Sequence, residues 1–178
     1  GGLREHFGIK DKDVNAYYIE VPAGATLSNR GFCDNKLDYS MNLKADVTYN
    51  FSIWAKPAKT TSVTVALLDA NGNRVSSKVI VKLTKAGQWK KYTAKLEATA
   101  SCMGQLSLEF AGDTAIDMVS LMPDNVWGGK KEKKSATAYA NYKGNPNYRL
   151  RKDLVEAMLE LHPTFLRFPG GCISEGSY

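Results

Sequence analysis

The sequence has little of what most metal-binding and many catalytic sites require. Among 178 residues there are two histidines, His6 and His162, and three cysteines, Cys33, Cys102 and Cys172. They show no Cys-x-x-Cys or Cys/His ligand spacing, so no zinc site is expected. An odd number of cysteines cannot all pair, and sequence alone leaves a Cys33–Cys102 disulfide open.

Long apolar runs are also missing. No stretch reaches the roughly 18 apolar residues of a membrane-spanning helix, so neither such a helix nor a membrane partner is predicted. The chain opens Gly-Gly-Leu-Arg, without a methionine or a signal-peptide pattern. This start fits a cut within a longer protein, and the cellular location of the protein cannot be predicted from it.

Acidic residues are fewer than basic ones, 18 against 24, and the resulting net charge of +6 raises the question of nucleic-acid binding. Much of the excess comes from one run, residues 130–134 (KKEKK), in a stretch that reads as a loop. No nucleic-acid recognition motif accompanies it. We therefore predict solvated lysines and no nucleic-acid partner.

Residues 16–122 carry short runs in which apolar and polar residues alternate, as in half-buried strands. Asn71-Gly72 supplies the positive-φ residues of a tight hairpin. We predict a mainly β fold, an antiparallel β-sandwich of the jelly-roll, galactose-binding-like kind, over residues 1–123. The predicted strands are Ala16–Val21, Leu37–Leu43, Thr48–Lys56, Ser62–Leu68, Arg74–Leu83, Gln88–Leu96, Gln105–Phe110 and Ile116–Leu121.

The strand predicted over Thr48–Lys56 has one apolar and one polar face. The apolar face holds Tyr49, Phe51, Ile53 and Ala55, and the polar face holds Asn50, Ser52, Trp54 and Lys56. Trp54 is the one large aromatic on that polar face, and Asn50 and Asp38 are predicted beside it. Sugar C–H faces stack on indoles while amides and carboxylates bind hydroxyls, so this face is a candidate glycan site. The alternative is that Trp54 packs against a neighbouring domain or loop.

The pattern changes after Pro123. Residues 124–148 are rich in Gly, Lys and Asn, and they are predicted to form a linker. Residues 149–161 place five apolar side chains on one helical stripe, with Asn147 as N-cap, and 164–168 read as a buried strand. We therefore predict that 149–178 is one helix–strand unit of a truncated (β/α)8 barrel. Its exposed apolar surface would fold back on the sandwich, self-associate or stay disordered. The stripe is Leu150, Leu154, Val155, Met158 and Leu161.

The chain closes on Phe165-Leu-Arg-Phe-Pro-Gly-Gly-Cys-Ile-Ser-Glu-Gly, a strand that enters a glycine-rich turn. Strand ends of this kind hold the active sites of barrel enzymes. This block resembles family-51 glycoside hydrolases, the α-L-arabinofuranosidases. The same resemblance covers residues 117–123 (DMVSLMP) and 150–157 (LRKDLVEA). The earlier part resembles carbohydrate-binding modules of family 4/9 at 30–32 (RGF), 47–56 (VTYNFSIWAK) and 88–92 (QWKKY), where Trp89 and Tyr92 match a buried anchor.

The resemblance implies part of a retaining hydrolase that removes arabinofuranosyl groups from plant polysaccharides such as arabinan and arabinoxylan. Such enzymes use two carboxylates about 5–5.5 Å apart. The family's two catalytic glutamates lie on later strands, beyond Tyr178, so no catalytic residue is expected in this chain and the chain alone is predicted to be inactive. The remainder of the barrel is the implied partner, and the implied location is extracellular or periplasmic.

Arg167 matches the arginine that lines the family's sugar pocket, where its fork of donors can hold a carboxylate or hydroxyls. The alternative is an ion pair that closes the barrel. Cys172 matches a position that approaches the sugar, with a small buried hydrophobe as the alternative. Glu175 is interpreted as structural.

Three readings of the whole chain remain open: an enzyme segment, an autonomous carbohydrate-binding module, and a sandwich that only braces the barrel. No cofactor is predicted. A structural calcium on Asp34, Asp113 and Asp117 is a minor alternative without EF-hand-like spacing.

Overall fold

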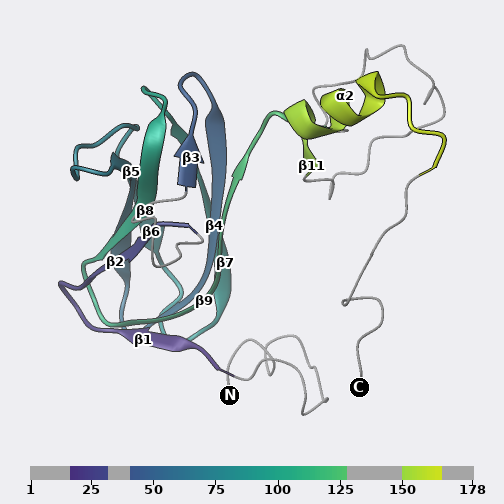
Figure 1. The fold of residues 1–178 in the computed structure, drawn as a ribbon. Helices are drawn as coiled ribbons and strands as arrows, with labels where there is room; N and C mark the ends of the chain where they lie inside the picture. The colour runs from purple at the N-terminus through teal and green to yellow at the C-terminus, as the bar shows by residue number, and fades with distance from the viewer. Residues whose placement is uncertain (1–16, 32–40, 128–149, 166–178) are drawn as a thin grey trace, which may run out of the picture. The chain divides into compact units, whose positions relative to one another are not determined.

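The computed structural model describes residues 17–31, 41–127 and 150–165, and the statements below concern those ranges. The chain divides into two compact units, residues 1–124 and residues 125–178. The first unit is a sandwich of two antiparallel sheets, which confirms the predicted fold class (Figure 1).

Sheet A holds four strands, in the order β1 (Ile19–Val21), β9 (Thr114–Pro123), β4 (Thr48–Pro57) and β7 (Lys90–Glu97). Sheet B is built around β8 (Cys102–Phe110), with β5 (Thr61–Asp69) and then β6 (Val79–Leu83) on one side. The other side of β8 pairs with two short strands in succession, β2 (Thr26–Asn29) and β3 (Met41–Leu43). All of these pairings are antiparallel, as short alternating strands favour.

The core lies between the two sheets. Phe51 and Ile53 of β4 are at most 1% exposed, and they share one cluster with Leu67 of β5 and Phe110 of β8. Burial of each such side chain contributes roughly 1.5–3 kcal/mol. The predicted facing of Thr48–Lys56 is confirmed, since every apolar-face residue is buried and every polar-face residue is at least partly exposed.

The predicted Asn71-Gly72 turn follows β5. Of the two residues only Gly72 has a positive φ, +83°, so the predicted pair of positive-φ residues is wrong at Asn71. Asp69 Oδ1 accepts hydrogen bonds from the N–H groups of Asn71 and Asn73, each at 2.8 Å. The strand after this turn is shorter than predicted, because β6 begins at Val79 rather than at Arg74. Residues 74–78 instead cross between the sheets, with bridges Leu68↔Arg74 and Ser76↔Ala98.

Two further differences lie at short strands. The first strand begins at Ile19 and not at Ala16, which lies outside the described residues. Strand β2 was not predicted, because Thr26-Leu-Ser-Asn carries one apolar side chain and its strand character comes from pairing with β8. Such a strand is defined by its hydrogen-bond partner and not by its own pattern.

The second unit contains β10 (Val126–Trp127) paired with β11 (Leu150–Arg151), followed by α2 (Lys152–Glu160). The predicted linker is therefore wrong at 126–127, and the helix begins three residues later than predicted. Arg151 precedes the helix in extended conformation, and its Nε donates to Asp153 Oδ1 at 3.0 Å. The predicted cap Asn147 lies outside the described residues.

The apolar side chains of α2 are partly or largely exposed. Leu154 is 53% exposed, Met158 is 41% exposed, and none of the residues of α2 is buried. The predicted strand 164–168 is wrong at Thr164 and Phe165, which are not in a strand, and its remainder lies outside the described residues. No helix in the described ranges is long and apolar enough to cross a bilayer.

Candidate functional site

The candidate site is the face of sheet A that points away from the core, called here the outer face of sheet A. It is built from the side chains of β4 that alternate with the buried ones, together with their neighbours in register on β1, β9 and β7. On β4 these residues are Asn50, Ser52, Trp54 and Lys56. Residues paired across antiparallel strands point to the same side, so the register defines the face.

Trp54 lies at the centre of one cross-strand row. Asp117 of β9 is its partner on one side, and Lys91 of β7 is its partner on the other. The indole is half-buried, while Lys91 is exposed. An aromatic ring between a carboxylate and an ammonium group offers both an apolar surface and hydrogen-bonding groups of opposite kind. This is the chemistry that a sugar ring requires.

A β-bulge in β9 sets this row. The β4–β9 register shifts between Ser52 and Trp54, so that Ile53 has no single partner. Met118 takes φ +47°, a region that L side chains rarely adopt, and its N–H donates to Asp117 Oδ1 at 2.6 Å. Bulges often re-aim side chains, and this one fixes the carboxylate beside Trp54.

A second row lies two residues further along β4. There Ala115 of β9 stands between Glu20 of β1 and Lys56 of β4. The Lys56 Nζ lies 5.6 Å from the ring centroid of Tyr18 and 5.5 Å from that of Trp89. The two rings meet edge to face, with centroids 5.5 Å apart at 77°. The ammonium group is thus held against two aromatic rings.

The predicted burial of Trp89 is wrong. Trp89 and Tyr92 were both predicted to be core residues, but only Tyr92 is buried, at 7% exposure. Trp89 is half-buried and contacts Tyr18 and Lys56. Alternation explains the difference, because residues 89 and 92 have opposite parity on an extended segment.

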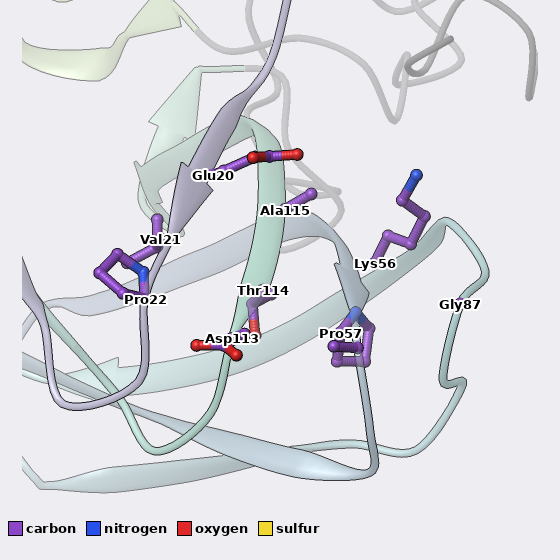
Figure 2. Close-up of a pocket in the computed structure, with 10 residues that line it drawn as sticks. Glu20, Val21, Pro22, Lys56, Pro57, Gly87, Asp113, Thr114 and Ala115 are labelled. Carbon is purple, nitrogen blue, oxygen red and sulfur yellow. The ribbon is translucent and has the colours of Figure 1, made fainter.

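A pocket of about 540 Å³ opens at this second row (Figure 2). Glu20 and Lys56 stand on either side of Ala115, whose short side chain leaves the hollow between them. Pro57 and Val21 lie next to this row but are at most 3% exposed, so they offer the pocket little apolar surface. The lining of the pocket therefore holds two carboxylates, Glu20 and Asp113, and one ammonium group, Lys56.

Asp113 fixes the edge of this pocket. Its Oδ1 accepts a hydrogen bond from the N–H of Ala23 at 2.8 Å, and its backbone carbonyl accepts one from the N–H of Ala58 at 2.9 Å. The side chain thus joins the loop after β1 to the turn before β9. Its carboxylate is used structurally.

The structure brings only some of the sequence-predicted residues together. Trp54 and Asn50 share the outer face of sheet A, where Asn50 is exposed and pairs with Lys95 and Met122. Asp38, Arg167, Cys172, Glu175 and Asp34 lie outside the described residues. Among the residues that are described, no cluster of three or more His, Cys, Asp or Glu side chains could hold a metal ion.

Glu20, Tyr18, Lys56 and Asp117 are site residues that sequence reasoning did not assign to the site. The period of two already placed Lys56 on the face of Trp54. The other three become neighbours only through strand pairing, which a single sequence does not specify. Tyr18 links this group, since its hydroxyl donates a long 3.5 Å hydrogen bond to Glu20 Oε1.

Two carboxyl groups elsewhere have altered acidity. Hydrogen bonds from the side chain and backbone of Asn73 lower the pKa of Asp69, and a hydrogen bond from Arg151 lowers the pKa of Asp153. A general acid in glycoside hydrolysis requires a raised pKa. Neither group has the protonation behaviour of such an acid.

Known proteins resemble the chain along most of its length, although no protein-family model matches it. The extracellular exo-α-L-arabinofuranosidase of Streptomyces chartreusis is 33% identical over 160 residues, which cover 89% of this chain and 16% of that protein. α-L-Arabinofuranosidase 1 of Arabidopsis thaliana is 30% identical over 145 residues, which cover 79% of this chain and 19% of that protein. The chain is homologous to one segment of the α-L-arabinofuranosidases.

A solved structure agrees with this relationship. An arabinose-bound family-51 α-L-arabinofuranosidase, MgGH51, superposes on 86% of this chain and 24% of its own, with a TM-score of 0.63 and 21% identity. At that identity the match establishes the shared fold. The chain thus spans less than a fifth of the length of the arabinofuranosidases it matches in sequence, 16% and 19%.

Proposed function

We propose that this chain is the sandwich-bearing part of a retaining α-L-arabinofuranosidase that releases arabinose side groups from plant polysaccharides. The observation that carries the proposal is the match to arabinofuranosidases over 89% of the chain. Secretion is part of the proposal, because the Streptomyces relative is named as extracellular. Arg167 and Cys172 would line the sugar pocket of the assembled enzyme, and the catalytic carboxylates would come from outside this chain.

The test of this first proposal is the longer coding sequence that contains the chain. We expect its product to release arabinose from arabinan and arabinoxylan, and the first product seen by NMR to keep the α configuration of the substrate. A product with inverted configuration would contradict the retaining mechanism. A longer product without arabinofuranosidase activity would contradict the proposal as a whole.

A second proposed function, sugar binding by the sandwich itself, is supported by the row Asp117–Trp54–Lys91 on the outer face of sheet A. A half-buried indole between two polar groups can stack on a sugar ring while its neighbours bind hydroxyls. We expect arabinan or arabinoxylan in a native gel to retard the chain, and Trp54→Ala to remove the retardation.

The control for that experiment is Ile80→Ala. Ile80 is 61% exposed on β6, which belongs to the other sheet, so its loss should not change the retardation. Equal mobility of wild type and Trp54→Ala in every polysaccharide would exclude Trp54 as a binding residue. It would then favour the third reading, a sandwich that only braces the barrel.

A further inference from the structure

We propose that the pocket between Glu20 and Lys56 is a second sugar subsite, so that the outer face of sheet A binds an oligosaccharide rather than a single sugar residue. The inference rests on the proposed sugar-binding function of Trp54. It adds a second binding site, in which Lys56 and Glu20 bind the sugar hydroxyls. It also names the ligand class, a neutral pentose oligosaccharide whose chain runs along β4.

The pocket lies close enough to Trp54 for one oligosaccharide to reach both. Lys56 follows Trp54 by two residues on β4, so both side chains point to the same side of sheet A. Two residues along a strand span about 6–7 Å. That spacing is on the scale of one sugar residue, so adjacent residues of one chain can occupy the Trp54 row and the pocket.

The pocket is large enough to hold a sugar residue. Its volume is about 540 Å³, which lies within the range of roughly 300–1,000 Å³ of small-molecule sites. The depth comes from Ala115, the short residue between Glu20 and Lys56 in the register. The hydrogen bond of Asp113 to the N–H of Ala23 holds the rim in place.

The side chains at the rim of the pocket can bind sugar hydroxyls. Tyr18 joins the two charged side chains, since its ring lies under Lys56 and its hydroxyl donates to Glu20. Trp89 holds Lys56 from the other side. A positioned ammonium donor and a carboxylate acceptor can bind neighbouring hydroxyls of one sugar. Lys56 faces two carboxylates in the lining, Glu20 and Asp113, so the pocket favours an uncharged sugar over an acidic one.

The experiment uses the indole N–H signals of the three tryptophans of the full 178-residue chain, Trp54, Trp89 and Trp127. The probes are L-arabinose and (1→5)-linked arabino-oligosaccharides of two to four residues. We expect arabinose to shift Trp54 alone. The longer ligands should shift Trp54 and Trp89 together and bind about tenfold more tightly or better, because the second subsite is filled at high effective concentration. Trp127, in the second unit, should not move.

Two variants separate the subsite from Trp54. Lys56→Met removes the ammonium and keeps the length, and Ala115→Leu fills the hollow. Each should abolish the gain in affinity with ligand length while Trp54 still responds to arabinose. Lys82→Met, on an exposed lysine of β6 in the other sheet, is the matched control and should keep the gain.

Four outcomes would overturn the subsite. In the first, Trp54 responds but affinity does not depend on ligand length. In the second, Trp89 stays unmoved at saturation with the tetrasaccharide. In the third, both variants keep the gain with length. The first three leave the proposed role of Trp54 intact. In the fourth, no indole responds to any ligand, and the subsite fails together with sugar binding by this sandwich.

Discussion

At the scale of single residues, Asp69 makes the turn after β5 sensitive to acid. Its carboxylate accepts hydrogen bonds from the Asn73 side chain and from the N–H groups of Asn73 and Asn71, and these bonds lower its pKa from the ordinary value of an aspartate. A group whose pKa is lower in the folded state stabilises the fold above its unfolded pKa. That contribution is lost as the pH falls through the folded value.

The prediction compares wild type with Asp69→Asn in thermal melts between about pH 6 and about pH 3. Wild type should melt higher near neutral pH, and the difference should shrink as the pH falls. A difference that is constant over this range would show that the charge of Asp69 does not contribute.

Among the glycines of the described residues, Gly104 has the closest neighbours to an added Cβ. A Cβ built at this position would lie 2.3 Å from the backbone oxygen of Leu68 and 2.8 Å from Leu43 Cδ1. Strand β8 would have to move away from both β5 and β3 to relieve the clash. We expect Gly104→Ala to lower the free energy of unfolding by about 1–3 kcal/mol or more in urea denaturation.

Gly24→Ala is the control for Gly104, because a Cβ there meets no atom within 4 Å and the strain comes only from its φ of +79°. Its cost should be about 1–2 kcal/mol. A smaller loss at Gly104 than at Gly24 would contradict the close approach between β8 and β5.

At the scale of elements, β4 carries the two roles of the sandwich on its two faces. Phe51 is 1% exposed in the core, while Trp54, three residues on, lies half-buried on the opposite side. We expect Phe51→Ala to cost about 3–5 kcal/mol of unfolding free energy. Trp54→Ala should cost less than half as much and should remove sugar binding instead. Equal losses of stability would show that Trp54 is a core residue.

The facing of β4 was predictable from the sequence because alternation is a local property. The neighbours of Trp54 were not predictable. Asp117 reaches its row only because a bulge at Met118 shifts β9 against β4 by one residue, and a one-residue shift changes every partner beyond it. Trp89 was misplaced for a different reason, because the local alternation that was visible in the sequence was not applied to it. Its parity sets it apart from Tyr92, although the two are close in sequence.

The helix boundary shows a different limit. The apolar stripe from Leu150 to Leu161 has helical spacing throughout, yet Leu150 and Arg151 pair with Val126 and Trp127 as a short ladder. Strand pairing between segments far apart in sequence overrides a local pattern. The predicted roles of Arg167, Cys172 and Asp38 stay predictions, since these residues lie outside the described ranges.

At the scale of the whole molecule, the exposed apolar side chains of α2 should govern how the chain behaves in solution. Leu154 and Met158 lie one turn apart and are 53% and 41% exposed. In the isolated chain we expect this stripe to bind a hydrophobic dye and to promote association as concentration rises. The double substitution Leu154→Ser and Met158→Ser should reduce both.

Light scattering across a dilution series measures this association. Ser77→Ala, an exposed change in the sandwich, serves as the control. A wild-type chain that remains monomeric at every concentration and binds no dye would contradict the expectation.

The central claim is that this chain is a segment of an α-L-arabinofuranosidase whose catalytic carboxylates lie outside it. Its most direct test is the release of 4-nitrophenol from 4-nitrophenyl α-L-arabinofuranoside by the purified 178-residue chain, measured beside a complete arabinofuranosidase. We predict release no faster than the buffer blank, because retaining hydrolysis requires a pair of carboxylates about 5–5.5 Å apart. Sustained release that survives further purification would contradict the claim, since both carboxylates would then have to lie within this chain.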